Sequence, residues 1–227
     1  MSREPGVENI VSEAIRVLLV DDHTLFRSGV KALLQGESGF EVAGEAADSL
    51  EGVKKASELQ PDVVLLDLHM PGIAGKDAVR QFLEAAPQTH IVMLTVSEDA
   101  DDLLDSLRAG ACGYLLKKIE TGTLLDSIRR ASEGDSVISA EMTGKLVRGL
   151  QSSREPAPVP EKDPLTPRER EILAQLAKGG SNKEIARALD LAESTVKIHV
   201  QNILRKLHLS SRVQAAVYAI ERRLTSA

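Results

Sequence analysis

The stretch "RVLLVDDHT", residues 16–24, runs four apolar residues directly into two adjacent aspartates, Asp21 and Asp22. A short apolar run rich in Val and Leu is typical of a buried β-strand. Two carboxylates side by side at the end of such a strand repel each other, and this stretch holds nothing that neutralises them. The pattern therefore indicates that groups from elsewhere in the chain meet Asp21 and Asp22.

Four more apolar runs follow within about 100 residues. They are "EVAGEAA" (41–47), which Gly44 interrupts, "DVVLLDL" (62–68), "HIVMLTV" (90–96) and "GYLLKK" (113–118). The segments between them repeat apolar residues at helical spacing, with Leu25, Val30, Leu33 and Leu34 on one face of 23–36, and Leu103, Leu104 and Leu107 on one face of 99–109. Continuous apolar strands that alternate with helices predict an α/β fold, a flavodoxin-like (βα)5 doubly wound parallel sheet over residues 14–134.

The rest of the chain has a different character. We expect residues 1–13 to be a tail and residues 135–164 to be a linker. The linker assignment rests on "QSSREPAPVPEKDP" (151–164), which carries four prolines. A helix is expected within the linker at 139–150. Residues 165–227 read as four helices without strands. From Glu161 onward the chain has 12 Lys and Arg against 8 Asp and Glu, whereas the preceding part has 16 against 26. An acidic part joined to a basic part makes the basic end a candidate for nucleic-acid binding.

Composition narrows the class of protein. No apolar run approaches the roughly 20 residues that cross a bilayer, and the N-terminus lacks the apolar stretch of a secretory signal. The single cysteine, Cys112, forms neither an intrachain disulfide nor a thiolate metal site, and we expect it to be a small packing residue. A cytoplasmic protein is the simplest expectation.

The acidic residues at the strand ends predict a metal site. Asp67 ends the third run, and in a flavodoxin-like order that strand neighbours the first, so Asp67 meets Asp21 and Asp22. Three carboxylates in one cleft favour a hard divalent cation, and Mg²⁺ is the best match. Thr95 and Lys117 end two further strands at the same edge. Carboxylates, a metal, a hydroxyl and an ammonium suit phosphoryl chemistry with one Asp as nucleophile.

The motifs "VDDH", "LLDLHMPG", "LTVS" and "GYLLK" resemble the receiver domain of two-component response regulators over about residues 14–134. The resemblance implies that Asp67 accepts a phosphoryl group from a sensor histidine kinase. It also implies roles for Asp21 and Asp22 in Mg²⁺ binding, with Asp22, Asp67 and the backbone carbonyl of His69 as direct ligands. Thr95 and Lys117 would bind the phosphoryl oxygens, and Tyr114 matches the family's switch aromatic.

Three further residues lie close to the predicted pocket in the sequence: Val96, His23 and His69. Val96 stands where many receivers have a smaller residue that makes room for the switch aromatic, which puts the coupling of Thr95 to Tyr114 in doubt. The imidazoles of His23 and His69 flank the acidic residues. We expect both to be exposed side chains near the pocket and not metal ligands.

The basic end carries the signals of a helix-turn-helix. Thr166, Pro167 and Glu169 predict a capped helix that Gly179 and Gly180 end, and Ser181 with Glu184 predicts another. In "ESTVKIHVQNILRKL" (193–207), a core face repeats at helical spacing: Val196, Val200, Ile203, Leu204 and Leu207. The opposite face mixes polar residues with one isoleucine: Lys197, Ile198, Gln201, Asn202 and Arg205. Such a face could read the major groove, and the 2% aromatic content favours duplex over single-stranded targets.

The motifs "LTPRERE", "NKEIARAL", "STVKIHV" and "LRKL" resemble the LuxR-type DNA-binding domain. Joined to a receiver, they identify the chain as similar to the NarL/FixJ family, and within it to the NarL-like nitrate/nitrite regulators. The resemblance adds Thr195 to the expected DNA contacts. Two positions depart from the pattern. Ala192 replaces the usual Ser or Thr cap unless Glu193 or Ser194 substitutes, and Gln201 replaces a Lys.

The resemblance implies a transcription regulator with no enzymatic activity beyond Mg²⁺-dependent self-phosphorylation and autodephosphorylation at Asp67. We expect the unphosphorylated receiver to cover the recognition helix, through a charge attraction that salt weakens. Phosphorylation would release the C-terminal domain, and the last helix (211–223) would pair two copies as a homodimer on promoter DNA, where RNA polymerase is a further expected partner. Two alternatives stay open: a metal-dependent phosphohydrolase that uses Asp67, and a constitutive DNA binder with an inert receiver.

Overall fold

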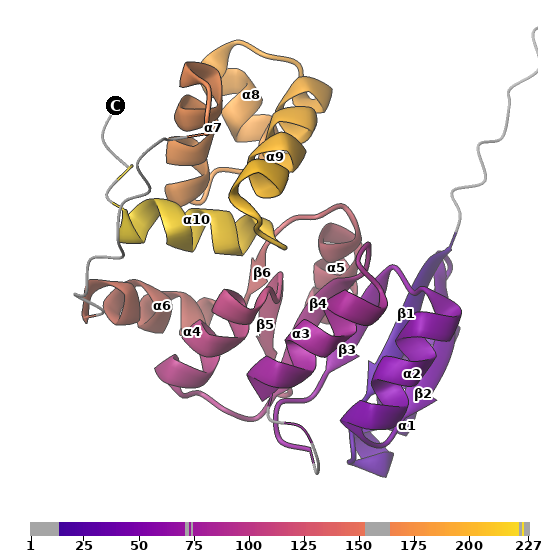
Figure 1. Ribbon diagram of the computed structural model, residues 1–227. Coiled ribbons are helices and arrows are strands. Elements are labelled where there is room, and N and C mark those ends of the chain that lie inside the picture. The colour runs from indigo at the N-terminus through magenta and orange to yellow at the C-terminus, as the bar shows by residue number, and fades with distance from the viewer. Residues whose placement is uncertain (1–13, 71–72, 74, 153–163, 223, 225–227) are drawn as a thin grey trace, which may run out of the picture.

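The computed structural model describes residues 14–70, 73, 75–152, 164–222 and 224. Its N-terminal part is a parallel sheet between two layers of helices, with strand order β2-β1-β3-β4-β5-β6 (Figure 1). The strands are β1 (Ile15–Val20), β2 (Phe40–Ala46), β3 (Val63–Leu66), β4 (His90–Thr95), β5 (Gly113–Leu116) and β6 (Val137–Ile138). The flavodoxin-like order of the first five is confirmed. The two-residue β6, which pairs with β5, is an addition that the sequence pattern did not predict.

Six helices accompany the sheet. They are α1 (Thr24–Gln35), α2 (Ser49–Leu59), α3 (Gly75–Ala85), α4 (Ala100–Ala109), α5 (Thr121–Ser132) and α6 (Ala140–Ser152). Along β1, Val17 and Leu19 pack with residues of α1 and α5, whereas Leu18 and Val20 pack with residues of α2, α3 and α4. This alternation follows from the two-residue period of a strand. The central strands β3, β4 and β5 are likewise buried on both faces, as their continuous apolar sequences predicted, whereas the edge strand β2 is only partly buried.

The prediction that Leu25 packs on the apolar face of its helix is wrong. Leu25 is 88% exposed, although Val30 and Leu34 of the same helix are buried and Leu33 is partly buried. Leu25 lies in the first turn of α1, and residues 21–23 connect this helix to the end of β1. The apolar spacing that correctly describes the rest of α1 therefore does not extend to its first turn.

The interrupted second strand is real, and Gly44 has a packing role there. The pairing of β1 with β2 shifts register between Val17 and Leu18, so that Leu18 lies opposite Gly44. A Cβ on Gly44 would lie 2.8 Å from Leu59 Cδ1 and 3.3 Å from Leu18 Cδ1. The missing side chain thus lets α2 and β1 approach this irregular point of the strand.

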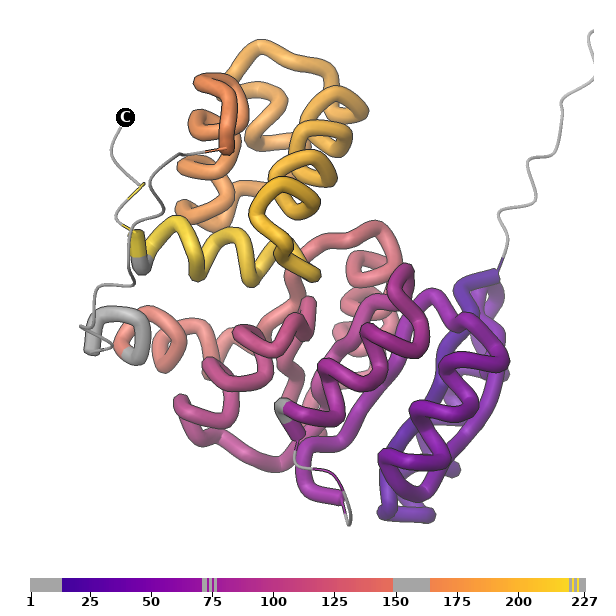
Figure 2. Tube along the Cα trace, viewed as in Figure 1, coloured from indigo at the N-terminus to yellow at the C-terminus, as the bar shows by residue number. Residues whose placement is uncertain are grey.

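The C-terminal part consists of four helices, as predicted: α7 (Pro167–Ala177), α8 (Asn182–Leu189), α9 (Glu193–Leu207) and α10 (Arg212–Glu221). Both predicted capping boxes are present, Thr166 with Glu169 and Ser181 with Glu184. The apolar face of α9 packs against α7 and α8 around Ile172 and Ile185. In the chain trace these helices form a separate body, with α10 on the side of α4 and α6 (Figure 2).

The predicted tail at 1–13 and the proline-rich centre of the linker at 153–163 lie outside the described residues. The helix expected at 139–150 is α6. Among the described residues, no helix combines the length and the apolar character needed to cross a bilayer.

Candidate functional site

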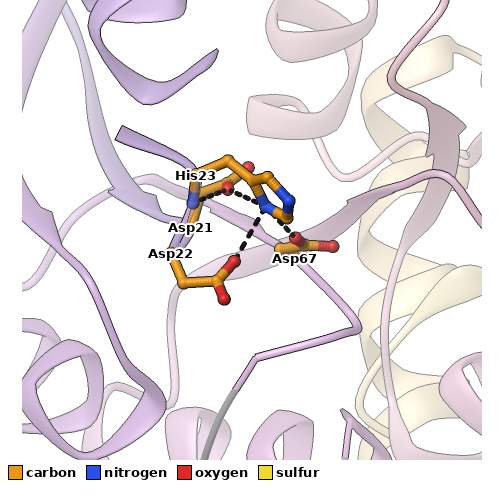
Figure 3. Close-up of side chains that lie close together, drawn as sticks. All are labelled: Asp21, Asp22, His23 and Asp67. Atoms are coloured by element: carbon orange, nitrogen blue, oxygen red, sulfur yellow. Dashed lines mark hydrogen bonds and ion pairs between the residues drawn. The ribbon is translucent and has the colours of Figure 1, made fainter. Parts of the chain in front are cut away.

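The three predicted acidic residues meet at the carboxyl ends of β1 and β3. Potential ligand atoms of Asp21, Asp22, His23 and Asp67 all lie within 4.8 Å of one another (Figure 3). The side chains of Asp21 and Asp67 are only 8% and 2% exposed, and that of Asp22 is 31% exposed. The backbone N–H of Asp67 donates to the carbonyl of Val20, which holds the two strand ends in register. The convergence expected from the strand order is therefore confirmed.

Lys117 enters the same cluster from the end of β5. Its Nζ lies 2.8 Å from Asp21 Oδ2 and 2.6 Å from Asp67 Oδ2, and 4.8 Å from the centre of the Phe26 ring. Burial on its own would lower the pKa of Lys117, but the hydrogen bonds to Asp21 and Asp67 outweigh burial and raise that pKa. Lys117 is therefore a firmly charged ammonium that bridges two carboxylates.

One carboxylate oxygen in the cluster lacks a hydrogen bond. Asp22 Oδ1 is buried without a hydrogen-bond partner, although His23 Nδ1 lies 2.8 Å away. Three carboxylates against one ammonium leave a net charge of about −2 when His23 is neutral. A buried carboxylate oxygen whose near neighbour is an imidazole nitrogen, together with an excess of two negative charges, fits a divalent cation with oxygen ligands.

Thr95 and His69 line another side of the pocket. Thr95 is fully buried, and its Oγ1 accepts a hydrogen bond from the N–H of Ser97 at 3.2 Å. The exposed His69 places Nδ1 3.5 Å from Thr95 Oγ1, and its backbone N–H donates to Asp67 Oδ1 at 3.4 Å. The structure thus brings Thr95 and Lys117 to the predicted edge of the sheet.

Tyr114 and Thr95 both contact Ser97. The Tyr114 ring is fully buried, and its hydroxyl donates to the carbonyl of Ser97 at 3.2 Å. Burial raises the pKa of Tyr114 to about 12. Val96 is 71% exposed. Since its side chain points away from the core, Val96 does not occupy the space of the Tyr114 ring, and the expected obstruction is wrong.

The prediction for Cys112 is confirmed, whereas that for His23 is confirmed only in its exposure. Cys112 is buried as predicted, and burial raises its pKa to about 12. His23 is 64% exposed, as expected, but its ring is directed at the carboxylates, with Nδ1 also 3.7 Å from Asp67 Oδ2. Sequence reasoning set His23 aside because an exposed imidazole is common. The signal that could have found it is its position directly after Asp22.

The outward face of α9 has the exposure expected of a DNA-reading surface. Lys197, Gln201 and Arg205 are exposed, and Ile198 is 58% exposed. Thr195 and Asn202 are half-buried, and Asn202 accepts a hydrogen bond from Arg205 at 2.9 Å. Ala192 caps the helix without a side-chain hydrogen bond, so neither Glu193 nor Ser194 replaces the missing cap.

The receiver does not bury the outward side chains of the recognition helix, and the expectation that it keeps this helix from DNA stays a prediction. The outward residues of α9 stay exposed, whereas α10 packs against α4 and α6 of the N-terminal part. The contact joins apolar side chains and backbone carbonyls more than opposite charges. Net charge therefore failed to indicate which helix the receiver would contact.

Comparisons with known proteins agree with both halves of the chain. Residues 17–129 match the model of the response regulator receiver domain, and residues 163–219 match that of the bacterial regulatory proteins of the luxR family. The chain is 42% identical over 214 residues to the nitrate/nitrite response regulator protein NarL of Escherichia coli K12, covering 93% of this chain and 98% of that protein. It is 44% identical over 205 residues to the transcriptional regulatory protein LiaR of Bacillus subtilis, covering 90% and 96%.

Solved structures give the same result. A two-component response regulator of the LuxR family from Aurantimonas sp. SI85-9A1 superposes with a TM-score of 0.57 at 29% identity, covering 60% of this chain and 97% of that one. The alignment with the RcsB response regulator of Salmonella typhimurium covers 91% of this chain and 98% of that one, with a TM-score of 0.56. Because the identity is 22%, this likeness supports the fold alone. The chain belongs to the two-component response regulators of the NarL/FixJ family, which join a receiver domain to a LuxR-type DNA-binding domain and regulate transcription.

Proposed function

We propose that residues 14–134 form a receiver that takes a phosphoryl group on Asp67 from a sensor histidine kinase, and that this controls DNA binding by residues 165–227. The observation that carries the proposal is the bridge from Lys117 to Asp21 and Asp67 at 2.8 and 2.6 Å. A cation already placed on the acceptor carboxylate can neutralise the oxygens of an incoming phosphoryl group.

In the proposed reaction, a carboxylate oxygen of Asp67 forms a bond to phosphorus while the bond between phosphorus and the kinase's histidine nitrogen breaks. The product is an acyl phosphate on Asp67, and the histidine leaves as the free imidazole. Lys117 stays beside the new phosphoryl oxygens, and Thr95 offers its hydroxyl as a donor. The proposed chemistry stops at self-phosphorylation and autodephosphorylation, since the DNA-binding half agrees with a role that is not enzymatic.

We propose that Mg²⁺ is held by Asp22, Asp67 and the backbone carbonyl of His69, with Asp21 close by. Support comes from the buried Asp22 Oδ1 without a hydrogen bond and from the excess negative charge of the cluster. When bound, the ion supplies neutralising charge for the phosphoryl group. The protein's own part is to hold the carboxylates in place and to keep Asp67 largely out of bulk water.

Tyr114 is the proposed switch residue. The Thr95 hydroxyl accepts a hydrogen bond from the N–H of Ser97, and the Tyr114 hydroxyl donates one to the carbonyl of Ser97. Both side chains therefore contact the backbone of the same residue. Ser97 Oγ also donates to Asp102 in the first turn of α4 at 2.5 Å. A shift of Thr95 toward a phosphoryl group would therefore reach Tyr114 and α4 through one residue.

For the C-terminal domain, we propose that the exposed face of α9 enters the major groove of promoter DNA. The proposed contacts are Thr195, Lys197, Ile198, Gln201, Asn202 and Arg205. A phosphorylation-dependent homodimer on DNA, contact with RNA polymerase and a cytoplasmic location complete the proposal. Nitrate or nitrite is the signal that similarity to NarL suggests.

The decisive experiment is intact-mass measurement after incubation with Mg²⁺ and acetyl phosphate. We expect a gain of one phosphoryl group, which EDTA abolishes and which an Asp67→Ala variant lacks. No gain in a folded protein would leave a DNA binder with an inert receiver. Multiple turnover of a small phosphate ester would instead favour a phosphohydrolase.

A further inference from the structure

Lys117 has an aromatic partner in addition to the two carboxylates. Its Nζ lies over the ring of Phe26, 4.8 Å from the ring centre. The face of an aromatic ring attracts an ammonium electrostatically, and this attraction is strongest where water is excluded. The Lys117 side chain is only 9% exposed, so little water competes with the ring. The contact of Lys117 with Phe26 is therefore a cation–π interaction inside the acidic pocket.

The ring of Phe26 is supported by the rest of the receiver. Phe26 is half-buried and packs against the apolar cluster that includes Val30, one turn further along α1. Phe26 and Val30 also line a small hollow at the edge of the acidic pocket. The next residue, Arg27, donates to the backbone carbonyl of Asp21, which ties this turn of α1 to the end of β1. The position of the ring is therefore set by α1 and the sheet as well as by Lys117.

The other two partners of the ammonium change during the proposed reaction. Nζ lies 2.8 Å from Asp21 Oδ2 and 2.6 Å from Asp67 Oδ2. These carboxylates would be shared with Mg²⁺, and a bond from Asp67 to phosphorus removes the negative charge of its carboxylate. A lysine ammonium sits on a flexible four-carbon stem and can follow charge elsewhere. The ring of Phe26 is a partner that neither change alters.

We propose that Phe26 is a positioning residue for phosphoryl transfer, whose ring keeps the Lys117 ammonium in the pocket while its carboxylate partners are taken up by other groups. The inference rests on the proposed function and deepens it. Phe26 forms and breaks no bond, and it acts through Lys117 alone. The rate of phosphoryl uptake therefore depends on the electron density of this ring and not only on its size.

The first test replaces Phe26 in the full chain by phenylalanines with one, two and three ring fluorines, which withdraw electrons and change the shape little. Uptake from acetyl phosphate with Mg²⁺ is followed by intact mass. We expect the rate to fall with each fluorine, by about fivefold in the trifluorinated protein.

Phe40 offers a matched control for this series. The guanidinium of Arg129 lies 4.8 Å from the centre of the Phe40 ring, so this ring also faces a cation. Phe40 begins β2, at the other end of the strands from the acidic pocket. The same fluorinated residues at Phe40 should leave the rate of phosphoryl uptake unchanged.

The second test needs no phosphoryl donor. An aromatic ring shields protons above its face, so NMR should find the Cε protons of Lys117 shifted upfield in the wild type, with and without Mg²⁺. Phe26→Tyr keeps a ring and should keep this shift, whereas Phe26→Leu should lose it. The signal is assigned by its absence in Lys117→Met. In uptake, we expect Phe26→Tyr to stay within about twofold of the wild type and Phe26→Leu to be about fivefold slower.

The outcomes separate this inference from the proposed function. An uptake rate that ignores the fluorines at Phe26 in a folded protein would overturn the proposal, and so would equal slowing in the Phe40 series. Lys117 protons that do not respond to loss of the ring would overturn it as well. If the wild type takes up no phosphoryl group, the proposed function fails, and the NMR comparison still decides whether Phe26 holds the ammonium.

Discussion

Replacing Asp22 by Asn should stabilise the protein in the absence of metal. Two unit charges 4.8 Å apart repel by about 3.5 kcal/mol at an effective dielectric constant of 20. Neutralising Asp22 removes its repulsion from Asp21 and Asp67 and its attraction to Lys117, so about one such repulsion is relieved. Solvent screens this repulsion because the Asp22 side chain is 31% exposed. We therefore expect Asp22→Asn to raise the free energy of unfolding by about 1–2 kcal/mol.

Thermal unfolding in EDTA at pH 8, where an imidazole is normally neutral, would measure this gain. The expected rise in the Tm of the receiver is about 3–8 °C. Wild-type protein should also gain stability when Mg²⁺ is added, whereas Asp22→Asn should gain little. Asp126→Asn, an exposed carboxylate on α5, serves as the control and should leave both values unchanged. A lower Tm for Asp22→Asn in EDTA would refute the reasoning, because it would mean that Asp22 makes net favourable contacts without a metal.

Three further predictions concern other charges and one helix cap. Lys117→Met should slow phosphoryl uptake from acetyl phosphate at least a hundredfold by intact mass, because Asp67 loses its ammonium partner. Ala192→Ser should restore the missing cap of α9 and raise the free energy of unfolding by about 0.5–1 kcal/mol in urea titrations. Burial works against ionisation of Glu169, but its hydrogen bonds to Lys206 and Thr166 lower its pKa below the ordinary 4.5. Ionised Glu169 therefore stabilises the fold above pH 4.5, and this stabilisation is lost as the pH falls through the folded pKa. Glu169→Gln should make the free energy of unfolding depend less on pH in that acid range.

The acidic pocket could be predicted because strand order alone brings its members together. Asp21, Asp67 and Lys117 each follow an apolar run, and parallel strands present their carboxyl ends at one edge. Leu25 shows the limit of this reasoning. Periodicity says which residues share a face of α1, but it does not say that this face is covered along its whole length, and Leu25 in the first turn is exposed.

Contact between the two parts was less predictable, because it depends on shape more than on net charge. The last helix carried a usable signal, however. Its sequence "RVQAAVYAIE" is apolar on more than one side, and a helix of that kind is buried all round. The core of the DNA-binding domain covers the side with Ala215 and Ala219, and the receiver covers the side with Val213 and Val217. The short β6 had no comparable signal, since two residues are too few for a period.

Because α10 and the receiver belong to one chain, their contact benefits from proximity that a second copy lacks. Joining two partners in one chain can hold them at effective concentrations in the millimolar range. A second copy at micromolar concentration would then face a disadvantage of about a thousandfold, or about 4 kcal/mol, even if its contacts were equally good. On the proposed pairing through the last helix, the amount of protein in the cell would therefore affect the response alongside phosphorylation. Overproduction by about a thousandfold would bring a second copy level with the receiver as a partner of α10.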